Sequence, residues 1–255
     1  MMAEAGGTPE RSTMRSVERA FEVVDFLSNS GKPARLADVA RGTGLHIATA
    51  QRMLRVLERT NYVAQDSAGY SIGPAALAAA HSFLVGNNLV LTATPVLQEL
   101  AAALGLTASL SVRLGASRIL VARVEGSSPL RYQLPLGGRL PLHLGGGKVF
   151  LAYMDDVSRA AALGDMVQME TASGSIVTMP DFMASLNEIA SRGYAVSRNE
   201  RVAGAVSVSA PVRRDGDLLG VVQVVGPEET LTPELLSQAT RDVVNAGASI
   251  AARSR

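Results

Sequence analysis

The segment between residues 46 and 60 carries the clearest chemical signal in the sequence, because its side chains sort by type at helical spacing. One face, at spacings of four, three and four residues, holds Ala48, Arg52, Arg55 and Arg59. The opposite face is apolar and holds Ala50, Met53, Leu54 and Leu57. Guanidinium groups bind guanine edges and phosphates. An amphipathic helix with a merely solvated arginine face is the alternative interpretation.

The elements expected around this helix favour DNA binding over that alternative. Helical patterns cover residues 16–27 and 36–41, and the glycine turn at 42–44 separates the second of them from the arginine-bearing helix. Residues 62–65 and 70–72 then read as two strands joined by a tight turn. Three helices followed by a small hairpin are the order of a winged helix-turn-helix. In the first helix Val17, Phe21, Val24 and Leu27 share one face.

The predicted DNA contacts extend beyond the arginine stripe. Thr49 and Gln51 lie near the start of the helix, where small and polar side chains can bond base edges or phosphates. Ser67 and Gly69 lie at the tip of the hairpin, the wing. The complete predicted DNA-binding set is Ala48, Thr49, Gln51, Arg52, Arg55, Arg59, Ser67 and Gly69.

Composition limits the other possibilities. The net charge of the 255 residues is only +1, so DNA binding rests on local charge. There is no cysteine, which excludes disulfides and thiolate metal sites, and the three histidines are scattered, so we expect neither metal nor cofactor. No apolar run reaches the ~18 residues that span a bilayer, and residues 1–9 lack a signal pattern. We therefore expect a cytoplasmic protein without a membrane partner.

The chain divides into four predicted parts. These are a disordered tail (1–13), a winged helix-turn-helix domain (14–73), a linker helix (74–93) and an effector-binding domain (94–255). The last part mixes helices with short paired strands, which indicates an α+β fold with a mainly antiparallel sheet. Its strands are expected over 107–114, 118–124, 205–213 and 218–225.

An enzyme is disfavoured by its missing motifs. Gly147-Lys148 has the end of a phosphate-binding loop, but Leu142 and Val149 occupy positions that require glycine and Ser/Thr. No Gly-x-Ser-x-Gly elbow is present. A module that binds only protein is a further alternative, and the arginine stripe argues against it.

Four stretches in order resemble the IclR family of transcriptional regulators. They are residues 16–27; residues 36–40 with 44–45 and 52–54; residues 138–143 with 147–148 and 151–152; and residues 192–212 with 226–227. The resemblance covers nearly the whole chain after the tail. It implies a GAF-like effector domain, a homodimer formed through the DNA-binding half, often a dimer of dimers, and a double-stranded operator near a catabolic or efflux operon. It also implies a small-molecule effector, an aromatic or other organic acid, that modulates operator affinity.

A glycine turn at 145–147 is the candidate effector site. Backbone N–H groups at a helix start favour an anion, although spacing alone slightly favours a plain tight turn and helix N-terminus. The resemblance favours the pocket, because family members line it with this turn, with the loop after Gly193-Tyr194 and with two later strands. The matching positions are Gly145, Gly146, Ser197, Ala205, Ser207, Gln223 and Val225.

Several of these positions depart from the family pattern. Ser197 stands where an acidic residue is common and Ser207 where cysteine is common, while Gln223 and Val225 replace small hydroxyl residues. The glycine turn is also one residue shorter. We therefore expect one wall of the pocket to be less polar and the effector to be larger or more apolar than the family's smallest acids.

Four further polar residues lie before or after these positions in the sequence. Arg131 and Tyr132 precede the turn and could clamp a carboxylate, although a surface strand is the commoner explanation. Arg198 and Arg201 are expected to be solvated. The residues leave repression and activation of transcription both open.

Overall fold

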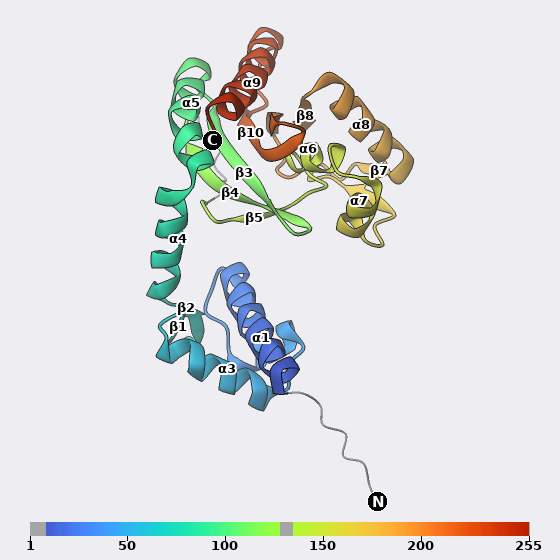
Figure 1. The fold of residues 1–255 in the computed structure, drawn as a ribbon. Helices are drawn as coiled ribbons and strands as arrows, with labels where there is room; N and C mark the ends of the chain where they lie inside the picture. Colours follow the sequence, from blue (N-terminus) through green and yellow to red (C-terminus); the bar gives the residue numbers. More distant parts are fainter. Residues whose placement is uncertain (1–8, 128–134, 255) are drawn as a thin grey trace, which may run out of the picture. The chain divides into compact units, whose positions relative to one another are not determined.

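The computed structural model describes residues 9–127 and 135–254 (Figure 1). The chain divides between Phe83 and Leu84 into two compact units. This division falls inside the segment 74–93 that was predicted to link two domains.

The N-terminal unit contains the predicted winged helix-turn-helix. Its elements are α1 (Pro9–Ser30), α2 (Leu36–Thr43), α3 (Ile47–Arg59), β1 (Val63–Gln65), β2 (Tyr70–Ile72) and most of α4 (Pro74–Gly86). Helix α1 begins at Pro9, so residues 9–13, which were assigned to a disordered tail, are helical. Proline fits a first helical position because its missing N–H would be unpaired there in any case. Residues 1–8 lie outside the described part.

Two local features fix the turn between α2 and α3. Helix α2 continues through Gly42, where a Cβ atom would lie 2.0 Å from the Phe26 ring, so the glycine permits close packing and does not end the helix. Gly44 ends it in the left-handed conformation, with φ of 66°. His46 then caps α3, its Nδ1 accepting from the Ala48 N–H at 3.4 Å.

The buried face of α1 differs from the expected one. Val23 and Leu27 are buried in the core of this unit, together with Val39, Leu54 and Val63. Val17 and Phe21, by contrast, are 52% and 64% exposed. The helical spacing correctly identified an apolar stripe, but only its C-terminal end packs inside the unit.

The C-terminal unit is an α+β domain built on one six-stranded antiparallel sheet, ordered β5-β4-β3-β10-β9-β8. Its helices are α5 (Asn88–Leu104), α6 (Gly147–Ala152), α7 (Asp156–Leu163), α8 (Met179–Arg192) and α9 (Pro233–Arg253). The sheet strands are β3 (Thr107–Leu114), β4 (Ser117–Val124), β5 (Arg139–Pro141), β8 (Ala195–Arg198), β9 (Ala205–Arg214) and β10 (Asp217–Pro227). A separate small hairpin is formed by β6 (Gln168–Glu170) and β7 (Ile176–Thr178).

Two apolar cores cover the two faces of this sheet. Helices α5 and α9 pack together on one face, and α6 and α8 lie on the other (Figure 1). Strand residues alternate between the faces: Val206 and Val208 point into the first core, whereas Ser207 and Ser209 point to the opposite face. Polar side chains in β9 thus gather on the face that carries the glycine turn.

Helix α5 begins at Asn88, inside the segment 74–93 that was predicted to be a single linker helix. The Asn87 side chain accepts from the Val90 N–H at 3.1 Å and starts a new helix, so the predicted linker is two helices. Pro95 lies inside α5. Within the described residues no single helix is long and apolar enough to cross a membrane, although the broken pair α4 and α5 passes that test together.

We predict that Gly69→Ala destabilises the N-terminal unit by about 2 kcal/mol or more. Gly69 has φ of 141°, and a Cβ atom there would lie 2.6 Å from the backbone oxygen of Ala34. The exposed neighbour Ala68 offers a matched control, and Ala68→Gly should cost less than about 1 kcal/mol. Thermal unfolding followed by circular dichroism measures both. Equal stability of Gly69→Ala and the parent chain would contradict this packing.

Candidate DNA-binding surface and effector cavity

Helix α3 presents its arginine face to solvent, as the amphipathic pattern predicts. Arg52, Arg55 and Arg59 are exposed, as is Ala48, while Thr49 and Gln51 are half-buried. The opposite face is buried and consists of Ala50, Met53, Leu54 and Leu57. Among the described residues, none of the three guanidinium groups has an ion-pair partner. Three positive charges on one helix face are thus available to phosphates or bases.

The two predicted wing residues lie in different environments. Ser67 is exposed, whereas Gly69 is half-buried against Ala34. Ala34 and Tyr70 exchange two backbone hydrogen bonds of 2.8 Å, which tie the wing to the segment before α2. The Asp66 carboxylate accepts the N–H groups of Ala68 and Gly69 at 2.8 and 3.1 Å and shapes the tip. Ser67 therefore remains a candidate contact, while Gly69 serves the wing's packing.

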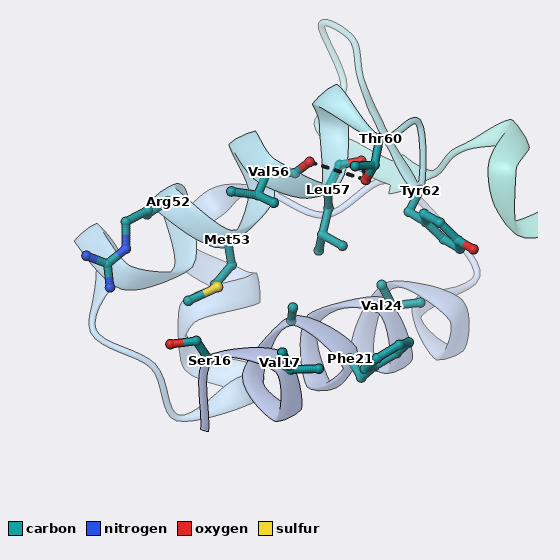
Figure 2. Close-up of a pocket in the computed structure, with 11 residues that line it drawn as sticks. Ser16, Val17, Phe21, Val24, Arg52, Met53, Val56, Leu57, Thr60 and Tyr62 are labelled. Carbon is teal, nitrogen blue, oxygen red and sulfur yellow. Dashed lines mark hydrogen bonds between the residues drawn. The ribbon is translucent and has the colours of Figure 1, made fainter. Parts of the chain in front are cut away.

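An apolar groove of about 550 Å³ runs between α1 and α3 (Figure 2). Val17, Phe21 and Val24 of α1 face Met53, Val56 and Leu57 of α3 across it, as Figure 2 shows. Ser16, Ala20, Thr60 and Tyr62 complete the lining together with Arg52. The exposed part of the α1 stripe thus belongs to a groove that sequence analysis missed, because spacing alone does not say what covers a face.

The predicted effector residues gather at one cavity on the sheet face that carries α6. Six of the seven line it: Gly145, Ser197, Ala205, Ser207, Gln223 and Val225. The seventh, Gly146, lies beside it, since a Cβ atom there would be 2.6 Å from Gln223 Oε1. Four further residues line the cavity, and the sequence did not predict them as effector-binding: Arg118, Glu200, Arg201 and Val202.

Glu200 already occupies the anion position that was expected at the glycine turn. Its Oε2 accepts from the Gly145 N–H at 2.8 Å, and its Oε1 pairs with the Lys148 ammonium. The side chains of Lys148 and Glu200 are only 8% and 12% exposed. The N–H groups of residues 147–149 donate to carbonyls of the same turn. The Gly145 N–H is therefore engaged by Glu200, while the predicted role of Gly146 stays a prediction.

Arg118 is the unexpected member of the cavity. Its residue is 1% exposed, and its Nη1 donates to Gln223 Oε1 at 3.0 Å and to Ser111 Oγ at 3.4 Å. Its Nε has no acceptor among the described residues. Burial and the positive charge of Arg201 lower the pKa of Arg118 to about 10. Its position directly before the apolar run 119–122 was the only sequence signal for it.

The expectation of a less polar wall is wrong for this cavity. Its volume is about 30 Å³, and the expected size of the effector stays a prediction. Arg118, Glu200 and Arg201 make the cavity strongly polar. Strand pairing and the 199–204 loop bring these three side chains to it, and the seven positions matched to the family pattern do not include them.

The four other polar residues near the predicted pocket positions in the sequence differ in where they lie. Arg198 is exposed and pairs with Glu228 at 3.3 Å, whereas Arg201 is half-buried and lines the cavity, so its predicted solvation is wrong. Arg131 and Tyr132 lie outside the described residues. In the part of the chain that the structure describes, no three His, Cys, Asp or Glu side chains gather as a metal site would require.

Comparison with known proteins assigns both units to one family. Residues 81–252 match the family described as bacterial transcriptional regulator IclR C-terminal, and residues 16–67 match the IclR helix-turn-helix domain. The HTH-type transcriptional repressor AllR of Escherichia coli K12 is 26% identical, covering 91% of this chain and 90% of its own. AllR of Klebsiella pneumoniae is 27% identical, covering 86% and 82%.

Solved structures share the fold. An IclR transcriptional regulator from Alicyclobacillus acidocaldarius aligns with a TM-score of 0.81 and 26% identity, covering 94% of this chain and 99% of its own. An IclR homologue from Microbacterium hydrocarbonoxydans, complexed with 4-hydroxybenzoate, aligns with a TM-score of 0.75 and 17% identity over 94% of this chain and 99% of its own.

We predict that His143, which responds to the charge of Glu200, makes stability depend on pH. Burial lowers the pKa of His143 below its ordinary 6.5, and the Glu200 charge partly opposes the shift. The unfolded chain therefore binds the proton more readily, so this part of the stability is complete above pH 6.5 and is lost as pH falls below it. His143→Gln should flatten the decline of the melting temperature between pH 7 and 5. His81→Gln, which changes an exposed histidine of α4, should not; parallel curves for all three proteins would refute the assignment.

Proposed function

The chain belongs to the IclR family of bacterial transcriptional regulators, and we propose that it is a repressor that binds operator DNA through α3 and responds to a small organic acid. Its DNA-binding unit and its effector-binding C-terminal domain are those of the family. Repression is proposed because the AllR relatives are named transcriptional repressors and the match covers most of their length. The regulators to which it is related are not enzymes, and we propose no catalytic activity and a place in the cytoplasm, where the operator lies.

The exposed arginine face of α3 is the observation that carries the proposal. A recognition helix enters the major groove and reads base edges with a few side chains. Arg52 and Arg55 lie one turn apart on the exposed face, without ion-pair partners among the described residues, and Thr49 and Gln51 lie closer to the helix start. We assign base and phosphate contacts to this face, with Ser67 of the wing adding a contact to the DNA backbone.

The chain is proposed to act as a homodimer, and the groove between α1 and α3 is proposed to receive a second copy. Isolated helices of about 12–15 residues are marginal in water, yet α4 is an apolar helix of 13 residues with no buried residue. Leu77 and Phe83 of α4 are exposed, as are Val17 and Phe21 at the groove. In a single copy the apolar side chains of α4 and the groove between α1 and α3 are in contact with water. Two copies can cover both of these surfaces at once. A dimer of dimers is compatible with this contact.

The effector is proposed to be an organic acid that binds the cavity around Gly145, Ser207 and Gln223. The 4-hydroxybenzoate bound to the Microbacterium homologue supports an acid as the chemical class. The small, polar cavity of this chain supports it further. Binding there is proposed to lower the affinity for the operator.

We predict that Arg52→Ala and Arg55→Ala each weaken binding to the DNA upstream of the protein's own gene. A bidentate contact to a base is worth roughly 1–3 kcal/mol, which corresponds to about 5- to 150-fold in affinity. Fluorescence anisotropy with a labelled fragment measures the loss.

Arg241→Ala supplies a control of equal charge on α9, in the other unit, and should bind DNA as the parent chain does. If Arg52→Ala and Arg55→Ala also bind like the parent chain, α3 is not the reading helix.

We predict that Val17→Asp together with Phe21→Asp converts the dimer to a monomer, because two carboxylates in the apolar groove cannot be covered by a second copy without losing their hydration. Light scattering coupled to size-exclusion chromatography measures the mass, and operator affinity should fall with it. Val157→Asp together with Val167→Asp places the same two charges on exposed apolar sites of the other unit and should leave the mass unchanged. A double variant that keeps the parent mass would contradict the proposed interface.

A further inference from the structure

The effector cavity contains more positive than negative charge. Arg118 and Arg201 line it as cations, and among the described residues Glu200 is the only carboxylate in its lining. That carboxylate is engaged by the Lys148 ammonium and the Gly145 N–H. Within the described residues, the hydrogen-bond acceptors of Arg118 are the neutral oxygens of Gln223 and Ser111. The guanidinium is thus buried without a carboxylate partner from those residues.

Such an arrangement is costly unless something else supplies the counter-charge. A buried ion loses its hydration, and only an opposite charge with good hydrogen bonds compensates for that loss. The cost persists at neutral pH, because burial and the charge of Arg201 lower the pKa of Arg118 only to about 10 and the group stays protonated. Hydrogen bonds to the neutral oxygens of Gln223 and Ser111 alone would not require a charged side chain at position 118.

The groups around Arg118 complete an anion site. Its Nε lacks an acceptor among the described residues, and so do the hydroxyl oxygens of Ser197 and Ser209. Ser197 lines the same cavity, and Ser209 lies against Gly146 beside it, where a Cβ atom would be 2.9 Å from its Oγ. A guanidinium presents parallel N–H donors that match the two oxygens of a carboxylate.

We propose that the buried guanidinium of Arg118 binds the carboxylate of the effector in the cavity between α6 and the sheet, and that the hydroxyl group of Ser197 donates a further hydrogen bond to it. Arg118 is then the residue that makes this cavity select acids over their neutral analogues. The proposal rests on the proposed function, since it takes this cavity as the effector site.

Thermal unfolding of the full-length chain with small acids tests the proposal. The probes are acetate, pyruvate and 4-hydroxybenzoate, each paired with its amide, at ionic strength held constant with sodium chloride. A ligand that binds only the folded state raises the melting temperature in proportion to its saturation. At least one acid should stabilise the parent chain saturably, and its amide should need at least about tenfold higher concentration.

The variant Arg118→Gln should lose that stabilisation, with the half-saturating concentration rising at least about tenfold. Its melting temperature without ligand should equal or exceed that of the parent chain, since an uncompensated buried charge is removed. Arg113→Gln is the matched control, because Arg113 lies directly opposite Arg118 in the β3–β4 register but is exposed. It should respond to the acid like the parent chain.

Three results would overturn the proposal: no acid stabilises the parent chain, acid and amide act equally, or Arg118→Gln keeps the acid response. An anisotropy titration with operator DNA separates this failure from failure of the proposed function. An acid that needs Arg118 but leaves operator affinity unchanged supports the anion site and refutes effector control. A neutral ligand that shifts operator affinity equally in the parent chain and in Arg118→Gln supports effector control and refutes the anion site.

Discussion

The Glu200 carboxylate is the contact on which the effector cavity depends. It joins the loop between β8 and β9 to the turn before α6 by accepting from the Gly145 N–H and pairing with Lys148. Removing one partner from a buried pair leaves the other charge uncompensated, which is strongly destabilising. Because this carboxylate is engaged at the turn, it is not the partner of Arg118, and this is why we propose that the Arg118 charge meets a ligand.

In the N-terminal unit, the single helix α3 contributes both to the exposed arginine face and to the apolar groove. The buried side of α3 fills the core with Leu54 and Leu57, its exposed side carries Arg55 and Arg59, and Met53 and Val56 border the apolar groove. Arg52 lies at the boundary, exposed with the arginine face and also part of the groove lining. A second copy seated in the groove, as proposed, would therefore lie next to the proposed DNA-reading side chains, which would connect the geometry of the dimer with DNA contact.

Local patterns predicted what depends on local structure. The faces of α3, the hairpin and the antiparallel strands were found because each is encoded by residues within a few positions. The predicted start of α1 was too late, because the sequence between Pro9 and Ser16 contains no feature that marks where the helix begins. The spacing of its apolar residues also could not show that Val17 and Phe21 stay exposed within the unit. Arg118 could not be predicted as a pocket residue, because only the pairing of β4 with β3 and of β3 with β10 brings it to Gln223, 105 residues away.

The central claim is that a small acid in the sheet cavity and operator DNA on α3 influence each other through one chain. Coupling free energy between two sites is reciprocal, typically about 5–150-fold in affinity. The direct measurement is the dissociation constant of the operator with and without saturating acid, and that of the acid with and without saturating operator. The account predicts the same factor, greater than one, in both directions. Two dissociation constants that do not change when the other ligand is present would contradict it.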